Sequence, residues 1–197
     1  MALLLASASP RRCDLLRQIG LDFTQVPVNL DETPRRGEAP GDYVQRMARE
    51  KATLARSGAG QSLVLAADTS VILDQRILGK PESDEEAVAT LRALSGRSHQ
   101  VLTSVALAGP GEALAECLVR TDVHFCVLEE AQIRAYVHTG EHRDKAGSYA
   151  IQGRGALFVQ RINGSYSAVV GLPLQETAQL LASAGQPVWR HWESPHE

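Results

Sequence analysis

The chain has 197 residues, of which 44% are hydrophobic and 22% charged, a composition typical of a soluble globular protein. The net charge of −3 and the aromatic content of 5% argue against a nucleic-acid-binding protein, which needs a basic face or stacking rings. No apolar run approaches the ~20 residues of a membrane helix, and no signal peptide is recognisable. Cys13, Cys117 and Cys126 are widely spaced and fit a reducing compartment, so we expect a cytoplasmic protein.

The first strand-to-helix junction organises the rest of the chain. A short apolar run predicts a buried strand, and Ser9 and Pro10 follow it at the N-cap and first helical positions. The helix then runs to Gly20. Its N-terminus would form an anion site, with Arg11 and Arg12 as added cations. The same residues also suit an ordinary capped helix with solvated arginines.

The next elements follow from periodicity. Residues 22–28 alternate polar and apolar side chains and predict a strand. Residues 29–40 form an acidic loop with two prolines, and loops of this length are often functional. An amphipathic helix is predicted over residues 42–56. Residues 62–67 are continuously apolar, which predicts a strand buried on both faces.

The second half of the chain predicts three hairpins and three helices. The hairpins are expected at residues 71–78, at 100–127 through Gly109-Pro110-Gly111, and at 156–170 through Asn163-Gly164. The helices are expected from a capping box at Ser83 to about Gly96, over 129–138, and from Pro173 to Leu181. We therefore expect one α/β domain over residues 1–185, with a mixed central sheet flanked by helices. Residues 186–197 are expected to form a loosely ordered tail.

Asp68 is the first candidate for catalysis because it directly follows a strand that is predicted to be fully buried. In open α/β sheets, ligands bind beyond the carboxyl ends of such strands. A carboxylate there can hold a divalent cation or activate a water molecule. The alternative is an aspartate that caps a turn.

Several lysines add to this picture. Lys51, Lys80 and Lys145 would each suit a solvated charge, but together with the two arginines they suggest a polyphosphate site. Glu32, on the acidic loop, is the natural second carboxylate, and two carboxylates with a triphosphate would hold Mg²⁺ or Mn²⁺. The chain has no P-loop, no G-x-G-x-x-G motif and no nucleophile elbow. His99 is expected to form a structural hydrogen bond.

The motifs of the chain, taken in order, match a known family. They are Leu5-Ala6-Ser7-Ala8-Ser9-Pro10-Arg11-Arg12, Ala48-Arg49-Glu50-Lys51-Ala52, Ala67-Asp68-Thr69, Gly79-Lys80-Pro81, Leu94-Ser95-Gly96, Asp144-Lys145-Ala146-Gly147, Ile151-Gln152-Gly153 and Val169-Val170-Gly171-Leu172-Pro173. From about residue 3 to 181 the chain resembles the Maf family of nucleotide pyrophosphatases. The resemblance implies a fold related to inosine triphosphate pyrophosphatases, with a cleft between two lobes, and a homodimer. It also implies cleavage between the α- and β-phosphates of a nucleotide with a divalent metal.

The resemblance assigns roles residue by residue. The position that matches the proton acceptor is Asp68. The positions that match substrate-selecting residues are Arg11, Thr69 and Gln152. The positions that match polar residues around the phosphates and the metal are Ser7, Glu32, Lys51 and Lys80. With Glu32 and Asp68 as metal ligands, the chain shows no departure from the family pattern at these points.

Two residues indicate the branch of the family. Thr69 and Gln152 are similar to the dTTP/UTP branch, whereas the 7-methyl-GTP branch carries Asp-Gln and Glu-Gly at these points. Hydroxyl and amide groups can pair with the O4 and N3 edge of a pyrimidine. We therefore expect hydrolysis of dTTP, UTP and modified pyrimidine nucleotides to the monophosphate and pyrophosphate. The alternatives are an enzyme for 7-methyl-GTP or inosine-type purines, and a non-hydrolysing nucleotide-binding regulator of cell division or septum formation.

Overall fold

A computed structural model describes residues 1–110 and 114–192 of the chain. The strands are β1 (Leu3–Leu5), β2 (Thr24–Gln25), β3 (Leu63–Leu73), β4 (Arg76–Leu78), β5 (Ser98–Ala108), β6 (Leu114–Phe125) and β7 (Val159–Asn163). The helices are α1 (Pro10–Gln18), α2 (Pro40–Arg56), α3 (Asp84–Leu94), α4 (Glu130–His138), α5 (Tyr166–Val170) and α6 (Leu174–Ser183). Three 3₁₀ turns are η1 (Ala146–Ser148), η2 (Arg154–Phe158) and η3 (Val188–His191). Over these described residues, no helix combines the length and the apolar character that crossing a membrane requires.

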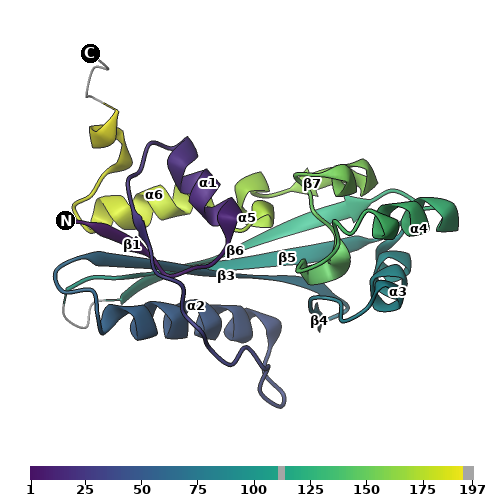
Figure 1. The fold of residues 1–197 in the computed structure, drawn as a ribbon, viewed down its shortest axis with the longest axis horizontal. Coiled ribbons are helices and arrows are strands. Elements are labelled where there is room, and N and C mark those ends of the chain that lie inside the picture. The colour runs from purple at the N-terminus through teal and green to yellow at the C-terminus, as the bar shows by residue number, and fades with distance from the viewer. Residues whose placement is uncertain (111–113, 193–197) are drawn as a thin grey trace.

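The strands form one mixed sheet, which confirms the predicted fold class. Its order is β2-β1-β3-β5-β6-β7, with β4 also paired to β3. β1 runs parallel to β2 and β3, and the other pairs are antiparallel. Helix α2 covers one face of this sheet, and α1, α5 and α6 lie over the opposite face (Figure 1). The alanine-rich face of α2 is buried against the sheet, as its amphipathic pattern predicts.

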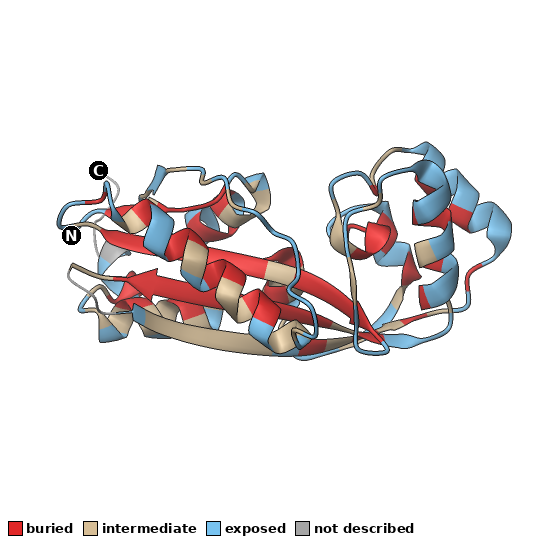
Figure 2. Cartoon of the chain, turned by 90° about the horizontal axis from the view of Figure 1, so that it is seen from below, coloured by how far each residue is buried: buried red, intermediate tan, exposed pale blue. Residues whose placement is uncertain are grey.

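The sheet extends from one lobe into a second, as the family resemblance implies. The long strands leave the layer of α2 and α1 and reach a smaller lobe that contains α3 and α4 (Figures 1 and 2). Figure 2 shows buried segments in both lobes. In the smaller lobe the buried rings of Phe125, Tyr136, Tyr149 and Phe158 meet edge to face.

The prediction that the buried strand stops at Asp68 is wrong. β3 continues to Leu73, because β5 pairs with it without interruption from Val64 to Ile72. On its other edge, β1 pairs with residues 63–65 and β4 with residues 71–73. Residues 66–70 therefore have no strand neighbour on that edge within the described chain. This interval, which we call the open edge of β3, lies where the parallel strand β1 ends.

Two further strand predictions differ from the structure. The strand expected over residues 22–28 contains only Thr24–Gln25. Tyr166–Val170 was expected to be a strand and is the helix α5. Ser165 caps this helix by accepting a hydrogen bond from Ala168 N at 3.2 Å, and Gly164 precedes the cap at a φ of 133°. A short apolar run fits a strand or a helix equally well, so the cap decides.

The five longer helices confirm the sequence predictions to within a few residues. Ser83 accepts from Glu86 N at 3.1 Å, as predicted, while the Glu86 carboxylate accepts from Glu82 N rather than from the cap residue. The β5–β6 hairpin is confirmed, although residues 111–113, with the expected turn residue Gly111, lie outside the described residues. The loose tail was expected to start at residue 186, but Val188 is buried. Residues 193–197 of that tail lie outside the described chain.

Candidate active site

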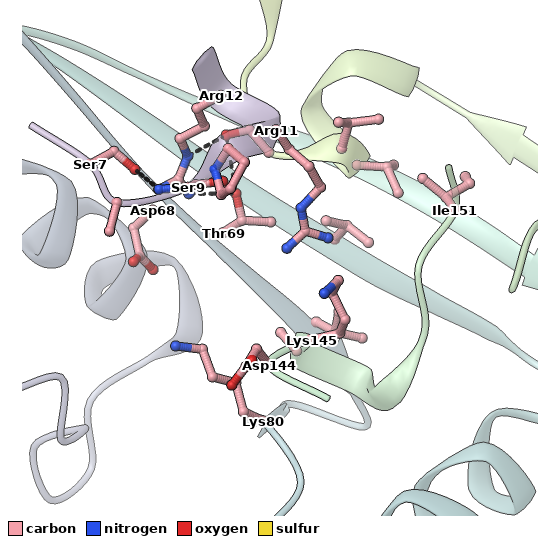
Figure 3. A pocket seen from close by; sticks show the side chains of 18 of the residues that line it. Ser7, Ser9, Arg11, Arg12, Asp68, Thr69, Lys80, Asp144, Lys145 and Ile151 are labelled. Carbon is pink, nitrogen blue, oxygen red and sulfur yellow. Dashed lines mark hydrogen bonds between the residues drawn. The ribbon is translucent and has the colours of Figure 1, made fainter. Parts of the chain in front are cut away.

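A cavity of about 850 Å³ opens at the open edge of β3 (Figure 3). It receives side chains from the loop after β1, from α1, from α2 and from β3, and from two loops of the smaller lobe. The structure brings all the sequence-predicted site residues into its lining: Ser7, Arg11, Glu32, Lys51, Asp68, Thr69, Lys80 and Gln152. Residues that are far apart in the sequence thus share one concave space, as ligand sites commonly do.

The two arginines at the start of α1 differ in their surroundings. Arg12 donates from Nε to Gly171 O at 2.8 Å, from Nη1 to Ser7 Oγ at 3.1 Å and from Nη2 to Thr69 Oγ1 at 3.3 Å. Burial lowers the pKa of Arg12, and the charge of Asp68 opposes that shift. Arg11 points into the cavity and has no hydrogen bond or ion pair to the described protein (Figure 3). Arg12 therefore connects α1 to β3 and to the loops that contain Ser7 and Gly171, whereas Arg11 is available to a ligand.

The start of α1 has its expected N-cap residue but lacks the expected capping hydrogen bond. Ser9 occupies the cap position, but its side chain makes no capping hydrogen bond. Instead Ser7 Oγ accepts from Ser9 N at 3.1 Å while it also accepts from Arg12. Ser7 is buried, and this pair of hydrogen bonds holds the loop that borders the cavity.

Lys51 joins the two predicted carboxylates. Its Nζ lies 2.8 Å from Asp68 Oδ1 and 2.6 Å from Glu32 Oε1. The side chains of Lys51 and Asp68 are each only 11% exposed, so this ion pair is well shielded from water. Burial raises the pKa of Glu32, but the hydrogen bond and charge of Lys51, together with the charges of Lys80 and Arg12, outweigh burial, and the net shift is downward.

The acidic loop that carries Glu32 is tied to α2. Tyr43 donates its hydroxyl to Glu32 O at 2.8 Å. Arg46 donates to both oxygens of Glu38, at 2.6 and 2.7 Å, and to Thr33 O at 3.3 Å. The hydrogen bond from Arg46 is the largest cause that lowers the pKa of Glu38, to about 2. Glu32 is therefore held in place by its backbone as well as by Lys51.

Thr69 lies on the face of β3 opposite to Asp68, because successive strand residues point to opposite faces. Asp68 meets Lys51 of α2, whereas Thr69 meets Arg12 of α1 and the Thr103 hydroxyl, 3.0 Å away. Both nevertheless line the cavity, which the open edge of β3 makes accessible from either face. Gln152 lines the same cavity, is exposed, and has no hydrogen-bond partner among the described residues.

The smaller lobe supplies Lys80, Asp144 and Lys145 (Figure 3). Burial and the nearby charge of Arg11 lower the pKa of Lys145. Its loop packs against the β3–β4 hairpin, where Gly147 N donates to Gly79 O at 3.2 Å. Sequence reasoning named Lys145 as a candidate cation but overlooked Asp144, although the Asp144-Lys145-Ala146-Gly147 motif contains both.

A second, buried hydrogen bond lies next to the cavity. Tyr149 lines the cavity, and its hydroxyl lies 2.9 Å from Nε2 of the buried His99. Burial lowers the pKa of His99 to about 4, so the ring is neutral near pH 7. The contact fits the structural hydrogen bond that the sequence predicts for His99.

The family model of the Maf-like protein matches residues 2–184. The chain belongs to the Maf-like family. This Maf-like chain is 57% identical over 193 residues to the dTTP/UTP pyrophosphatase of Shewanella oneidensis, covering 94% of this chain and 99% of the relative. It is 51% identical over 192 residues to that of Alcanivorax borkumensis (96% and 99% covered). Among solved structures, a HAM1 protein from Coxiella burnetii covers 93% of this chain, and 100% of that protein, at 16% identity and a TM-score of 0.48.

The cavity of the Maf-like chain suits a polyphosphate. Five basic side chains line it, against three carboxylates: Arg11, Arg12, Lys51, Lys80 and Lys145, and Glu32, Asp68 and Asp144. Two of these carboxylates could hold a cation, because Glu32 Oε2 and Asp68 Oδ2 have no partner among the described residues. Residues 1–110 and 114–192 contain no group of three or more His, Cys, Asp or Glu side chains that could bind a metal ion. This donor set fits Mg²⁺ or Mn²⁺, which bind one or two carboxylates and take further oxygens from phosphate and water.

Proposed function

We propose that the chain is a dTTP/UTP pyrophosphatase, which hydrolyses these nucleotides and modified pyrimidine nucleotides to the monophosphate and pyrophosphate. The observation that carries the proposal is the arrangement around the open edge of β3. Asp68, Lys51 and Glu32 meet on one face, and Thr69 and its neighbours meet on the other, within one cavity. A relative that is 57% identical is named dTTP/UTP pyrophosphatase, which supports the same activity for this chain.

Asp68 is suited to act as the general base. An ionised carboxylate has about four lone-pair sites, and Lys51 takes one of them on Oδ1, so sites remain to accept a proton from the attacking water as well as to hold a cation. The Lys51 ammonium also balances the negative charge of the site before a substrate enters. Proton transfer to a positioned base contributes about 10²–10⁴-fold to such rates.

Arg11 and Lys80 are suited to bind the phosphates. Neither forms a hydrogen bond or ion pair with the described protein, so both can turn toward an anion without losing an internal contact. Cations in this position stabilise the charge that develops on the leaving pyrophosphate. A divalent cation held by Glu32 and Asp68 would polarise the phosphoryl oxygens.

The test is product analysis with purified protein and dTTP, UTP, 7-methyl-GTP and ITP, each with Mg²⁺ or Mn²⁺. Separation of pyrophosphate from phosphate distinguishes cleavage after the α-phosphate from cleavage of the terminal phosphate. We expect monophosphate and pyrophosphate from dTTP and UTP. Turnover of a purine alone would contradict the substrate assignment, and tight nucleotide binding without any turnover would contradict the enzyme.

We also propose that this enzyme works in the cytoplasm as a homodimer that acts on small molecules. Cys13, Cys117 and Cys126 are free, which suits a reducing compartment. The exposed apolar side chains of Val127 and Leu157 would suit burial between subunits. Light scattering coupled to gel filtration measures the subunit number directly, and a monomer at micromolar concentration would contradict the dimer.

A further inference from the structure

The segment of residues 142–148, which presents Lys145 to the cavity, is held in an unfavourable position. Asp144 and Ser148 have φ values of 58° and 61°, in the left-handed region that residues other than glycine seldom adopt. Burial and the charge of Arg11 both lower the pKa of Lys145, so its ammonium lies where the charged form is disfavoured. Figure 3 shows that the side chains of Arg11 and Lys145 extend into the same cavity. Other contacts must therefore keep the segment in place.

The position of Lys145 depends on the two residues at the start of this segment. Lys145 N donates a hydrogen bond to His142 O at 3.2 Å, and Lys145 Nζ donates to Arg143 O at 3.1 Å. At the other end of the segment, Gly147 N donates to Gly79 O at 3.2 Å. That hydrogen bond fixes only the far end, so Lys145 stays in place only if His142 and Arg143 are held as well.

His142 and Arg143 both meet Asp84 of α3, but only the contact of His142 is shielded from water. His142 Nε2 lies 3.0 Å from Asp84 Oδ1, and the histidine side chain is 2% exposed. An ionised carboxylate can only accept, so His142 donates from Nε2. Arg143 Nη2 lies 3.9 Å from the same oxygen on a side chain that is 71% exposed, and such exposed pairs contribute little. The start of the segment is therefore anchored through His142.

Asp84 is a firm partner because the start of α3 is itself fixed. The preceding residue, Ser83, caps the helix by accepting from Glu86 N at 3.1 Å, and the apolar face of α3 is buried in the smaller lobe. Packing alone does not account for a histidine at position 142. Its Nδ1 is buried and has no hydrogen-bond partner among the described residues, whereas an apolar side chain would leave no polar atom unpaired. The hydrogen bond to Asp84 is what the histidine adds.

We propose that His142 is a positioning residue, which is anchored on Asp84 and holds Lys145 where its ammonium binds a phosphate group of a nucleoside triphosphate. A cation placed in advance costs less ordering when the substrate binds. It contacts the phosphates before and during the reaction, so it strengthens the binding of substrate and transition state alike. Loss of the anchor should therefore raise KM and leave kcat nearly unchanged. The inference rests on the proposed function, since it takes the cavity as a triphosphate site.

The test measures KM and kcat for UTP in the wild type and in His142→Leu, which fills the space but removes the donor. Calorimetry then gives Kd for the α,β-imido analogue of UTP, which cannot be cleaved between these two phosphates. We expect KM and Kd to rise about tenfold, the factor that corresponds to one hydrogen bond to a charged group. The value of kcat should stay within about twofold of the wild type.

A double-mutant cycle shows whether His142 acts through Lys145. Lys145→Met alone should raise KM about tenfold as well, because it removes a charged contact to phosphate. If His142 only positions this lysine, the double variant should be no worse than Lys145→Met. Two independent effects would multiply to about a hundredfold. General loosening of the smaller lobe would also multiply, so the cycle separates positioning from a merely structural role.

Two further variants serve as controls. Arg143→Met removes the other side chain that faces Asp84 Oδ1, and its KM should stay within about twofold of the wild type because that contact is exposed. His142→Gln keeps an N–H donor near the position of Nε2 and should restore most of the affinity. If His142→Leu does not fold, Asp84→Ala takes its place and should raise KM in the same way.

The outcomes separate the inference from the proposed function. An unchanged Kd in His142→Leu overturns the inference, and so does a fall in kcat without a rise in KM. Multiplying effects in the double variant overturn it as well. A wild type that binds the analogue but hydrolyses neither UTP nor dTTP overturns the proposed function, and the Kd of His142→Leu then still decides the inference. A wild type that does not bind the analogue overturns both.

Discussion

Replacing Lys51 by methionine removes the ammonium that separates Asp68 from Glu32 while it keeps the length of the side chain. In the wild type this ammonium lies 2.8 Å from one carboxylate and 2.6 Å from the other. Without it, the shielded carboxylate of Asp68 has no cation between it and the half-exposed carboxylate of Glu32. Removing one partner of a buried ion pair is costly for this reason, because it leaves an uncompensated charge.

The magnitude follows from the exposure of the three side chains. Lys51 and Asp68 are each 11% exposed, whereas Glu32 is 45% exposed and keeps much of its hydration. Breaking a buried pair costs about 3–5 kcal/mol, and the hydration of Glu32 places the expected loss near the lower end, at about 3 kcal/mol. In a chain of this size, each kcal/mol shifts the melting temperature by about 2–4 °C, so Lys51→Met should melt about 6–12 °C below the wild type.

The assay is thermal unfolding followed by circular dichroism across a range of pH. The pKa of Glu32 is lowered in the folded protein, so its contribution to stability is present above the unfolded pKa and is lost as the pH falls through the folded value. Lys51→Met lacks that contribution, and the gap between the two proteins should therefore close as the pH falls below about 4.3. Lys80→Met is the matched control, because Lys80 lines the same cavity without an ion pair to the described residues. Equal losses in the two variants, or a gap that does not change with pH, would refute the reasoning.

The remaining predictions concern the base, the buried histidine and one glycine. Asp68→Asn should keep the fold and lower kcat on UTP by about 10²–10⁴-fold, and near-normal turnover would exclude the general-base role. His99, whose burial lowers its pKa to about 4, stays neutral in the folded state while the unfolded chain takes up a proton below about pH 6.5. Stability should thus fall by about 3 kcal/mol between pH 6.5 and 4, and urea titrations of His99→Gln should show a flatter dependence. Gly147→Ala would force a Cβ to 2.8 Å from Val71 Cγ1 at a φ of 70°, so kcat/KM should drop, whereas Gly185→Ala, at a φ of 77° with nothing within 4 Å, isolates the cost of backbone strain.

The predictable part of the fold is the part that local chemistry determines. The helix that begins after Ser83 follows from its cap, and α2 follows from a stripe of alanines that recurs with helical spacing. Tyr166–Val170 was misjudged because a mostly apolar run of five residues is too short to show a period, and its structure depends on a cap at Ser165 and contacts with the sheet. The end of β3 was misjudged because polar Asp68 and Thr69 look like a strand terminus. Only the partner strand β5 shows that pairing continues through them.

The candidate site shows a similar division. Motifs along the sequence were enough to select the residues that line the cavity, because each motif carries its own polar groups. Their partners could not be predicted, since the contacts cross the fold: Arg12 reaches Gly171, which is 159 positions away, and Lys51 reaches Asp68, which is 17 positions away. The sequence treats Arg11 and Arg12 as equivalent cations. In the structure, Arg12 donates to three acceptors of the protein and has a structural role. Arg11 has no such acceptor among the described residues and is available to a ligand.

The open edge of β3 explains how two adjacent residues can serve two tasks. Within a fully paired sheet, Asp68 and Thr69 would point into separate layers that no single ligand could reach. Here β1 ends before residue 66 and β4 begins to pair at residue 71, so a ligand at this edge contacts both faces of one strand. The face covered by α2 holds Lys51 and Asp68, and the face covered by α1 holds Arg12 and Thr69. A ligand at that edge can therefore contact Lys51 on the first face and Arg11 of α1 on the second.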